Sequence, residues 1–116
     1  MKGDPVTEAE QLAQRQLEAY NARDIDAFCA CYAETVEVWR MPATEPAIRG
    51  MAKFRETYVE RFKSTNLHAK ILQRIALGSK VVDQEYVVGI KDVPVEVIVV
   101  YEAQAGLIRK VWFFSP

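Results

Sequence analysis

From Leu67 to the end of the chain, apolar and polar residues alternate with a period of two, and this alternation limits the possible folds most strongly. It predicts four strands, over residues 67–77, 80–90, 93–103 and 107–114. Short turns separate them, at Gly78-Ser79, at Lys91-Asp92 and at Gln104-Ala105-Gly106. Strands joined by such short turns pair as antiparallel neighbours, so we expect a four-stranded meander.

The first half of the chain has helical periodicity instead. A first helix opens with Asp4 or Thr7 as its N-cap, and the segment around Asn21 breaks it. Asp24 caps a short second helix, which makes a hairpin with the first. Its expected apolar stripe is Ile25, Phe28, Cys29 and Tyr32.

A strand at 36–41 follows the hairpin, and a third helix is expected over 51–62, with Phe54, Tyr58 and Phe62 on one side. The predicted order is ααβαββββ, which is an α+β fold in which the helices pack on a curved antiparallel sheet. With 116 residues, the chain is expected to form a single domain over 1–116.

Composition argues against several classes of partner. Fifteen basic and sixteen acidic side chains give a net charge of −1, and no basic stripe stands out, so we expect no nucleic-acid partner. The longest apolar run, residues 97–101, is too short to cross a bilayer, so we expect no membrane association. The first residues lack the apolar run of a signal peptide, and the expected location is the cytoplasm.

Several segments together resemble the nuclear transport factor 2-like superfamily, which includes ketosteroid isomerases and SnoaL-like cyclases. They are Tyr20-Asn21-Ala22-Arg23-Asp24-Ile25-Asp26-Ala27-Phe28, Tyr32-Ala33-Glu34, Arg49-Gly50 and the segment from Ala105 to Phe114. The resemblance spans nearly the whole chain and implies a cone-shaped fold that surrounds a pocket. It does not by itself imply a function, because one fold supports many functions.

The catalytic residues of the resembled isomerases are not found in this sequence. Alignment puts their general base at Arg40, their oxyanion-hole tyrosine at Gln16 and their protonated aspartic acid at Ile98. An arginine cannot accept a proton at neutral pH, and an isoleucine cannot donate a hydrogen bond. We therefore do not expect steroid isomerase chemistry.

The turns predict a register, and the register sorts side chains into two faces. Arg74 is expected opposite Asp83, and Glu85 opposite Ile98. Because Ile98 aligns with a pocket position of the isomerases, its face is expected to be concave, and this face also carries Glu96 and Phe113. The convex face is expected to carry Tyr86, Val97, Val99, Tyr101 and Trp112. It is the more apolar face, so we expect a homodimer that buries it.

Arg74, Asp83 and Glu85 form the main catalytic candidate. An arginine beside two carboxylates could leave one of them with a raised pKa, as a general acid or base. The alternative is a cross-strand ion pair between Arg74 and Asp83 that only fixes the register. His68, the one histidine, could transfer protons at the mouth of the cone or simply be exposed.

An apolar substrate is expected to contact a second set of side chains. These are Trp39, Tyr58, His68, Glu96, Ile98 and Phe113. Large residues such as Phe54 and Phe62 could instead fill the cone, and Arg40 could bind an anion or remain solvated. No metal and no cofactor are expected, because Cys29 and Cys31 would point roughly 200° apart on a helix and the histidine is isolated.

Three functions remain open at this point. The first is a cofactor-free acid–base enzyme that isomerises, cyclises or hydrates an apolar carbonyl compound. The second is a protein that binds a small apolar ligand without chemistry, and the third is a dimeric scaffold whose cone is filled.

Overall fold

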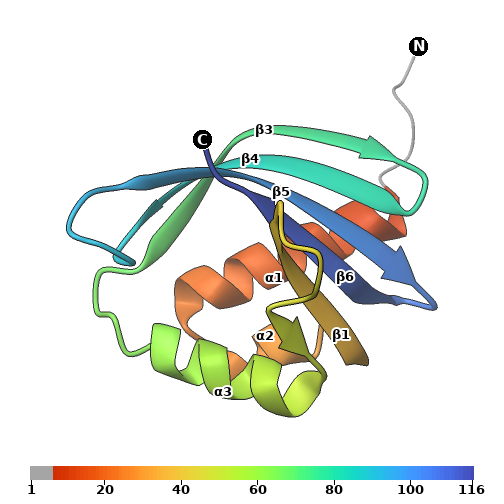
Figure 1. The fold of residues 1–116 in the computed structure, drawn as a ribbon, viewed down its shortest axis with the longest axis horizontal. Helices are drawn as coiled ribbons and strands as arrows, with labels where there is room; N and C mark the ends of the chain where they lie inside the picture. Colours follow the sequence, from red (N-terminus) through yellow and green to blue (C-terminus); the bar gives the residue numbers. More distant parts are fainter. Residues whose placement is uncertain (1–6) are drawn as a thin grey trace.

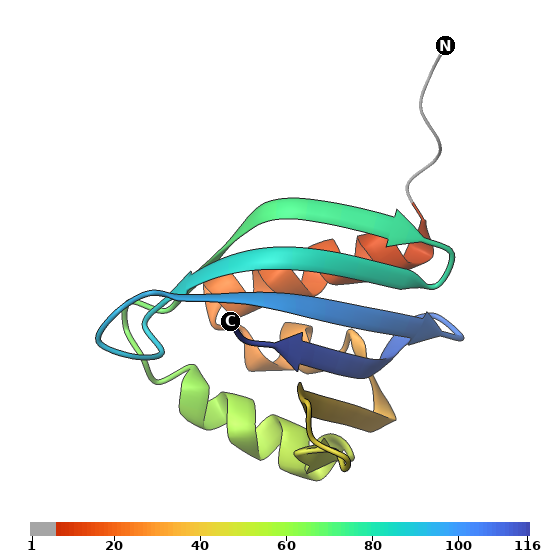
Figure 2. The same ribbon diagram turned by 45° about the horizontal axis from the view of Figure 1, so that its top comes forward.

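In a computed structural model of the chain, which describes residues 7–116, three helices pack against one face of a six-stranded sheet (Figure 1). In chain order the elements are α1 (Glu8–Ala22), α2 (Ile25–Cys29), β1 (Tyr32–Met41), β2 (Ile48–Arg49), α3 (Met51–Arg61), β3 (His68–Leu77), β4 (Lys80–Val88), β5 (Val95–Gln104) and β6 (Leu107–Phe114). The predicted α+β class is confirmed. The sheet curves over α1, and α3 lies below the sheet's edge (Figure 2).

Capping residues set where the first two helices begin. The Thr7 side chain accepts a hydrogen bond from the Glu10 backbone, and the Glu10 side chain accepts one from the Thr7 backbone, which is a capping box. Asp24 accepts from the backbone of Ala27 and starts α2, as predicted. Thr7 is therefore the cap of α1, and the alternative cap, Asp4, lies outside the described residues.

The second helix ends earlier than the sequence suggested. Tyr32, expected on the apolar stripe of that helix, instead begins β1, because α2 stops at Cys29. The ring of Tyr32 is nevertheless buried, with its centroid 4.4 Å from that of Phe54 on α3. Periodicity located the core residue correctly but not the element that carries it.

The strands lie in the order β2-β1-β6-β5-β4-β3. The predicted meander from β3 to β6 is present, with each strand antiparallel to the next. Two features were not predicted: β1 pairs with β6 in parallel, which makes the sheet mixed, and the short β2 pairs with β1. The chain reaches β6 from the far end of the meander, so its pairing partner on β1 is distant in sequence.

The predicted register between β3 and β4 holds near their turn, but an irregularity between Ile71 and Gln73 shifts it toward the start of β3. The predicted register between β4 and β5 does not hold. Arg74 lies opposite Asp83, as expected. Glu85, however, lies opposite Val97 rather than Ile98. The connection from β4 to β5 covers residues 89–94, so it is longer than the two-residue turn that was assumed. A shift of one residue moves every side chain of a strand to the other face.

This shift exchanges the faces of β5. Val97, Val99 and Tyr101 point toward the helices, whereas Glu96 and Ile98 are exposed on the convex side. The predicted placements of Val97, Val99 and Tyr101 on the convex face, and of Glu96 and Ile98 on the concave face, were wrong. Between β5 and β6, the register shifts beside Ala103, and Val99 lies opposite Phe113.

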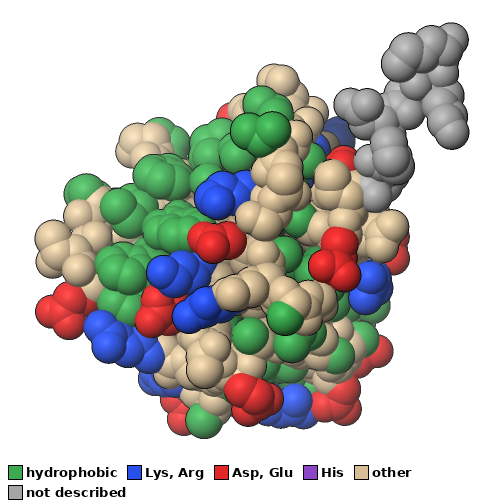
Figure 3. Space-filling view, turned by 90° about the vertical axis from the view of Figure 1, so that its right-hand side faces the viewer, with side chains coloured by type: hydrophobic (Ala, Val, Ile, Leu, Met, Phe, Trp, Pro, Cys, Tyr) green, Lys and Arg blue, Asp and Glu red, His purple; other side chains and the backbone are tan. Residues whose placement is uncertain are grey.

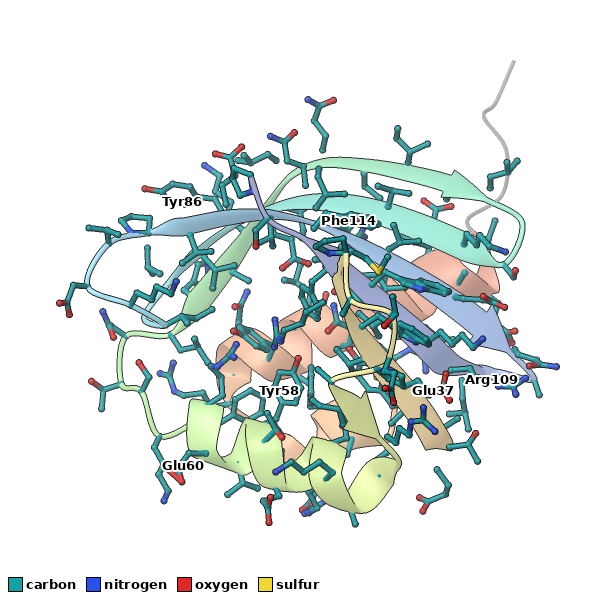
Figure 4. All side chains as sticks on the ribbon, viewed as in Figure 1. Glu37, Tyr58, Glu60, Tyr86, Arg109 and Phe114 are labelled. Atoms are coloured by element: carbon teal, nitrogen blue, oxygen red, sulfur yellow. The ribbon has the colours of Figure 1, made fainter. Side chains whose placement is uncertain are left out.

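Trp39 was expected to contact a substrate, but it does not line the cavity. It lies beside Trp112 in the parallel pairing of β1 with β6, so the two indoles share the convex face. The Trp39 Nε1 atom is buried without a hydrogen-bond partner among the described residues. Tyr86 and Phe114 point out from this side of the sheet as well (Figure 4). The homodimer stays a prediction, but Val97 and Val99, which point toward the helices, cannot belong to an interface on the convex face.

The outer surface carries both charge signs. In Figure 3, hydrophobic side chains gather at one side of the view, and lysine, arginine and acidic side chains are interspersed around them. No helix among residues 7–116 combines the length and the apolar character that crossing a membrane requires.

Gly89 is the glycine whose replacement the fold tolerates least. Its φ is +92°, and a Cβ at this position would lie 2.5 Å from the Cα of Leu67. Gly78 also has positive φ, +59°, but nothing lies within 4 Å of its Cβ position. We predict that Gly78→Ala costs about 1 kcal/mol of unfolding free energy from the left-handed backbone alone.

Gly89→Ala is predicted to cost at least about 2 kcal/mol more than Gly78→Ala, because backbone atoms must also move. Urea denaturation of both variants measures the difference. Equal losses for the two alanines would mean that the chain does not approach Gly89 as closely as described.

Candidate functional site

A cavity of about 260 Å³ lies between the concave face of the sheet and the three helices. Its lining comprises Gln16, Leu17, Tyr20, Phe28, Tyr32, Arg40, Phe54, Tyr58, Arg61, Ala69, Glu85, Val87, Ile90, Lys91, Val95, Val97, Tyr101, Val111, Phe113 and Ser115. Most of these side chains are apolar or aromatic. The few polar groups among them are therefore the ones that could act on a molecule in the cavity.

An aromatic cluster forms the helical side of the cavity. Phe28 of α2 stacks on Phe54 of α3, with ring centroids 5.6 Å apart, and Tyr58 lies 4.8 Å from each of them. Tyr58 rises from α3 toward the sheet (Figure 4). These rings fill the part of the cone next to the helices, and the cavity remains between them and the sheet.

Glu85 is the one carboxylate in the lining, and it is 7% exposed. Three polar side chains connect it to the core. The Tyr101 hydroxyl donates to Glu85 Oε2 at 3.1 Å, Gln16 Nε2 donates to the Tyr101 oxygen at 3.1 Å, and the Tyr32 hydroxyl donates to Gln16 Oε1 at 2.8 Å. Because Tyr101 donates to Oε2, Oε1 is the carboxyl oxygen available to a molecule in the cavity.

The pKa of Glu85 is raised from 4.5 to about 7. Burial is the main cause, since it disfavours the charged carboxylate, and the negative charge of Asp83 adds to it. The hydrogen bond from Tyr101 and the positive charge of Arg74 act in the opposite direction. Near neutral pH, Glu85 therefore exists in both protonation states and can either accept or donate a proton.

Arg74 and Asp83 form a bidentate ion pair next to this site. Arg74 Nε lies 2.7 Å from Asp83 Oδ1, and Arg74 Nη2 lies 2.9 Å from Oδ2. Asp83 is fully buried, while the guanidinium also donates to Gln14 on α1 at 3.0 Å. Neither residue lines the cavity. The predicted trio is thus divided: two members tie the sheet to α1, and Glu85 alone faces the cavity.

Arginines lie over two aromatic rings of the lining. The Arg40 guanidinium lies 5.0 Å from the centre of the Phe113 ring, and that of Arg61 lies 5.7 Å from the centre of the Tyr58 ring. Burial raises the pKa of Tyr58 to about 12, although the positive charges of Arg61 and Arg40 oppose the shift. The Tyr58 hydroxyl therefore keeps its proton at neutral pH and, as part of the lining, can donate it in a hydrogen bond to a molecule in the cavity.

The remaining predicted site residues divide between the cavity and the surface. Phe113 and Tyr58 line the cavity. His68 is exposed at the start of β3, and Glu96 accepts a hydrogen bond from Gln84 on the convex face. Ile98 shares that face, so none of these last three lines the cavity.

Sequence reasoning did not assign catalytic roles to Tyr101 and Gln16. Tyr101 follows Val97 and Val99 at intervals of two, so a correct register for β5 would have placed it inside. Gln16 was found only as the counterpart of a catalytic tyrosine in the resembled isomerases. In the part of the chain that the structure describes, no group of three or more histidine, cysteine or acidic side chains could hold a metal ion.

Comparison with known proteins identifies the family that has this fold. The profile of the SnoaL-like domain matches residues 13–111. The chain belongs to the SnoaL-like family. No curated protein matches its sequence.

Solved structures share the fold of this SnoaL-like domain at low sequence identity. A candidate ketosteroid isomerase from Kribbella flavida is 22% identical, with a TM-score of 0.82, over 94% of this chain and 78% of that one. An LEH-like epoxide hydrolase from M. tuberculosis is 20% identical, with a TM-score of 0.79, over 96% and 84%. A candidate polyketide cyclase from Sinorhizobium meliloti is 18% identical, with a TM-score of 0.76, over 89% and 93%. At these identities the likeness concerns the fold alone.

Stability should depend on pH through Glu85 in a direction that the raised pKa fixes. Below about pH 4.5 the carboxyl is protonated in both the folded and the unfolded protein, so the group costs nothing. As pH rises through 7, it must ionise inside the cavity, and the free energy of unfolding falls by about 3 kcal/mol in total.

Glu85→Gln removes this titration. We predict that the unfolding free energy of the variant, minus that of the natural protein, increases by about 3 kcal/mol between pH 4.5 and pH 8. Urea denaturation at several pH values measures this difference and cancels the contribution of the other carboxylates. A difference that stays constant with pH would contradict the raised pKa.

Proposed function

We propose that this SnoaL-like domain is a cofactor-free enzyme that moves a proton on a carbonyl compound with an apolar ring, with Glu85 as its general acid–base. One observation carries the proposal: a carboxyl with a pKa of about 7 lies in an apolar cavity of about 260 Å³. A base with that pKa is half ionised at neutral pH, and it can take a proton from carbon and then return it.

The proposed reaction begins with an ionised Glu85. Its Oε1 atom removes a proton from the carbon next to the carbonyl, the C–H electron pair becomes the C=C bond of an enolate, and the carbonyl π electrons move to oxygen. Where the substrate has a C=C bond β,γ to the carbonyl, the intermediate is a dienolate. Protonated Glu85 then delivers the proton to the γ-carbon of the dienolate, and the electrons on oxygen re-form the C=O bond. The net result is a shifted double bond, and the carboxylate is regenerated.

Tyr58 is the proposed donor to the enolate oxygen. Its hydroxyl keeps its proton at neutral pH, and the residue lies in the lining of the cavity. The positive charges of Arg61 and Arg40 act on the same hydroxyl, which strengthens it as a donor to a developing negative charge. In this proposal Arg74 and Asp83 are positioning residues, because they hold β4 without lining the cavity.

The hydrogen-bonded side chains behind Glu85 support the same assignment. Tyr101 holds Oε2, Gln16 holds Tyr101, and Tyr32 holds Gln16. This arrangement fixes the carboxyl and leaves Oε1 for a substrate. Structures with this fold carry names that refer to isomerisation, polyketide cyclisation and epoxide hydrolysis, and proton transfer is a step in each of these reactions.

We predict that the protein exchanges the α-protons of 2-tetralone, a bicyclic ketone, for deuterium in D₂O buffer. Glu85→Gln should reduce the catalysed exchange rate at least about 100-fold, because the amide cannot accept the proton. Glu96→Gln is the matched control, since this carboxylate lies on the same sheet but on its convex face. Proton NMR measures the rates.

An exchange rate equal to that of buffer in the natural protein would favour a non-catalytic binding protein instead. Equal rates in the Glu85→Gln variant and the natural protein would remove Glu85 from the mechanism.

The pH dependence tests the role of Tyr101 separately. Glu85 must be ionised to accept the proton, so the exchange rate should fall as pH decreases below about 7. The hydrogen bond from Tyr101 lowers the pKa of Glu85, and Tyr101→Phe should therefore move this decline to higher pH. A decline at the same pH, or at lower pH, would show that the hydroxyl does not stabilise the carboxylate.

A further inference from the structure

Positively charged side chains lie at the mouth of the cavity, and they outnumber the acidic side chains of its lining. The exposed Arg40 and Lys91 and the half-buried Arg61 line it, together with exposed Ser115, whereas Glu85 is buried. Three cationic side chains thus face a cavity with one carboxylate. That carboxylate is only partly ionised near neutral pH, so the cavity has a net positive charge.

The protein does not neutralise these cations itself. Within residues 7–116, none of the three forms a salt bridge, although five other basic side chains do. Glu60 is next to Arg61 in sequence, but it pairs with Lys63 at 3.1 Å and points away from the sheet (Figure 4). Asp92 follows Lys91 and does not line the cavity. Glu60 and Asp92 are therefore close to these cations in sequence but do not neutralise the positive charge at the mouth of the cavity.

The two arginines are oriented for binding. Each guanidinium lies over an aromatic ring of the lining, Arg40 over Phe113 and Arg61 over Tyr58. A ring next to a guanidinium helps to hold it in position. Arg61 also interacts with the Tyr20 hydroxyl, where it opposes the rise in the Tyr20 pKa that burial causes. A guanidinium has five N–H groups, so others remain available to donate. The edge of a guanidinium matches the two oxygens of a carboxylate.

We propose that the ligand of this cavity is a ring-containing carboxylate whose anionic group binds Arg40 and Arg61 at the mouth. Its apolar body then lies against Val97, Val111 and the aromatic cluster, and its far end reaches Glu85. The proposal rests on the proposed function, because it names the substrate class of the same cavity. Opposite charges at the two ends also fix the direction in which the ligand enters, since Glu85 repels the carboxylate.

Two probes of similar shape test the charge requirement. 2-Naphthoate carries a carboxylate, and 2-naphthamide carries a neutral amide on the same rings. Isothermal titration calorimetry at pH 7.5 should give about tenfold or greater preference for the naphthoate. The Arg40→Gln/Arg61→Gln double variant should lose this preference and keep the weaker affinity for the amide.

A matched control removes two arginines elsewhere. Arg49 and Arg109 are exposed and do not line the cavity. Arg109 lies near the start of β6, at the opposite end of the strand from Phe113 (Figure 4). The Arg49→Gln/Arg109→Gln double variant has the same net charge as the first and should keep the full preference. Circular dichroism checks that both double variants are folded. If one of them is unfolded, its two single-substitution variants are measured instead.

Equal affinity for the two probes in the natural protein, binding of neither probe, or a preference retained without Arg40 and Arg61 would each overturn the proposal. Binding needs no turnover, so its failure is distinct from a failure of the proposed reaction. Glu85→Gln should keep the preference for naphthoate while it loses proton exchange. If the natural protein prefers naphthoate but catalyses no proton exchange, the proposed carboxylate site is supported and the proposed enzymatic function is contradicted.

Discussion

Glu85 lies opposite Val97 where β4 pairs with β5, and the chemistry available in the cavity depends on that register. It brings Glu85 and Tyr101 to the same face of the sheet, close enough for a hydrogen bond of 3.1 Å. A shift by one residue would put Tyr101 on the convex face and Glu96 inside. Burial of Glu85, its raised pKa and the polar side chains behind it all follow from this pairing.

A buried carboxyl is costly to the fold, and the surrounding residues limit that cost without removing it. The Tyr101 hydroxyl and Arg74 lower the pKa of Glu85, but burial and the charge of Asp83 together raise it by more. The Arg74–Asp83 ion pair is satisfied within itself, with two hydrogen bonds between the same two side chains. It therefore stabilises the junction of β3, β4 and α1, but it cannot fully ionise the neighbouring glutamate. The raised pKa that results supports the proposed role of Glu85 in proton transfer.

The sequence was sufficient for the fold because the local signals agreed with one another. Period-two alternation, short turns and the caps at Thr7 and Asp24 all favoured one order of elements, and the structure has that order with the short strand β2 added before α3. The two-residue turn at Gly78 fixed the register of β3 with β4, so the Arg74–Asp83 pair was predictable. Pairing of β1 with β6 was not, because no local pattern connects strands so far apart in the chain.

The candidate site was only partly predictable, and for the same reason. Glu85 was identified because it lies two residues after Asp83 on β4, which a reliable turn had positioned. Tyr101 was missed because residues 89–94 form a longer connection whose length the sequence did not reveal. Arg61 was missed altogether, since the last turn of a helix often carries a basic residue for reasons unrelated to function. Only its position over Tyr58, at the mouth of the cavity, indicates a second role.

The positions that carry catalysis in the resembled isomerases explain why the fold alone gives no activity here. Two of them, Gln16 and Arg40, do line the cavity, so the fold provides a similar enclosure. The third was aligned to Ile98, which lies outside, and its neighbour Val97, which lies inside, cannot donate a hydrogen bond either. The acidic group lies instead on β4, and Arg40 replaces a base with a cation. A cavity in the same fold thus has the carboxyl proposed for proton transfer at another wall, and a positive charge where the resembled isomerases have a carboxylate, which agrees with the proposed anionic substrate.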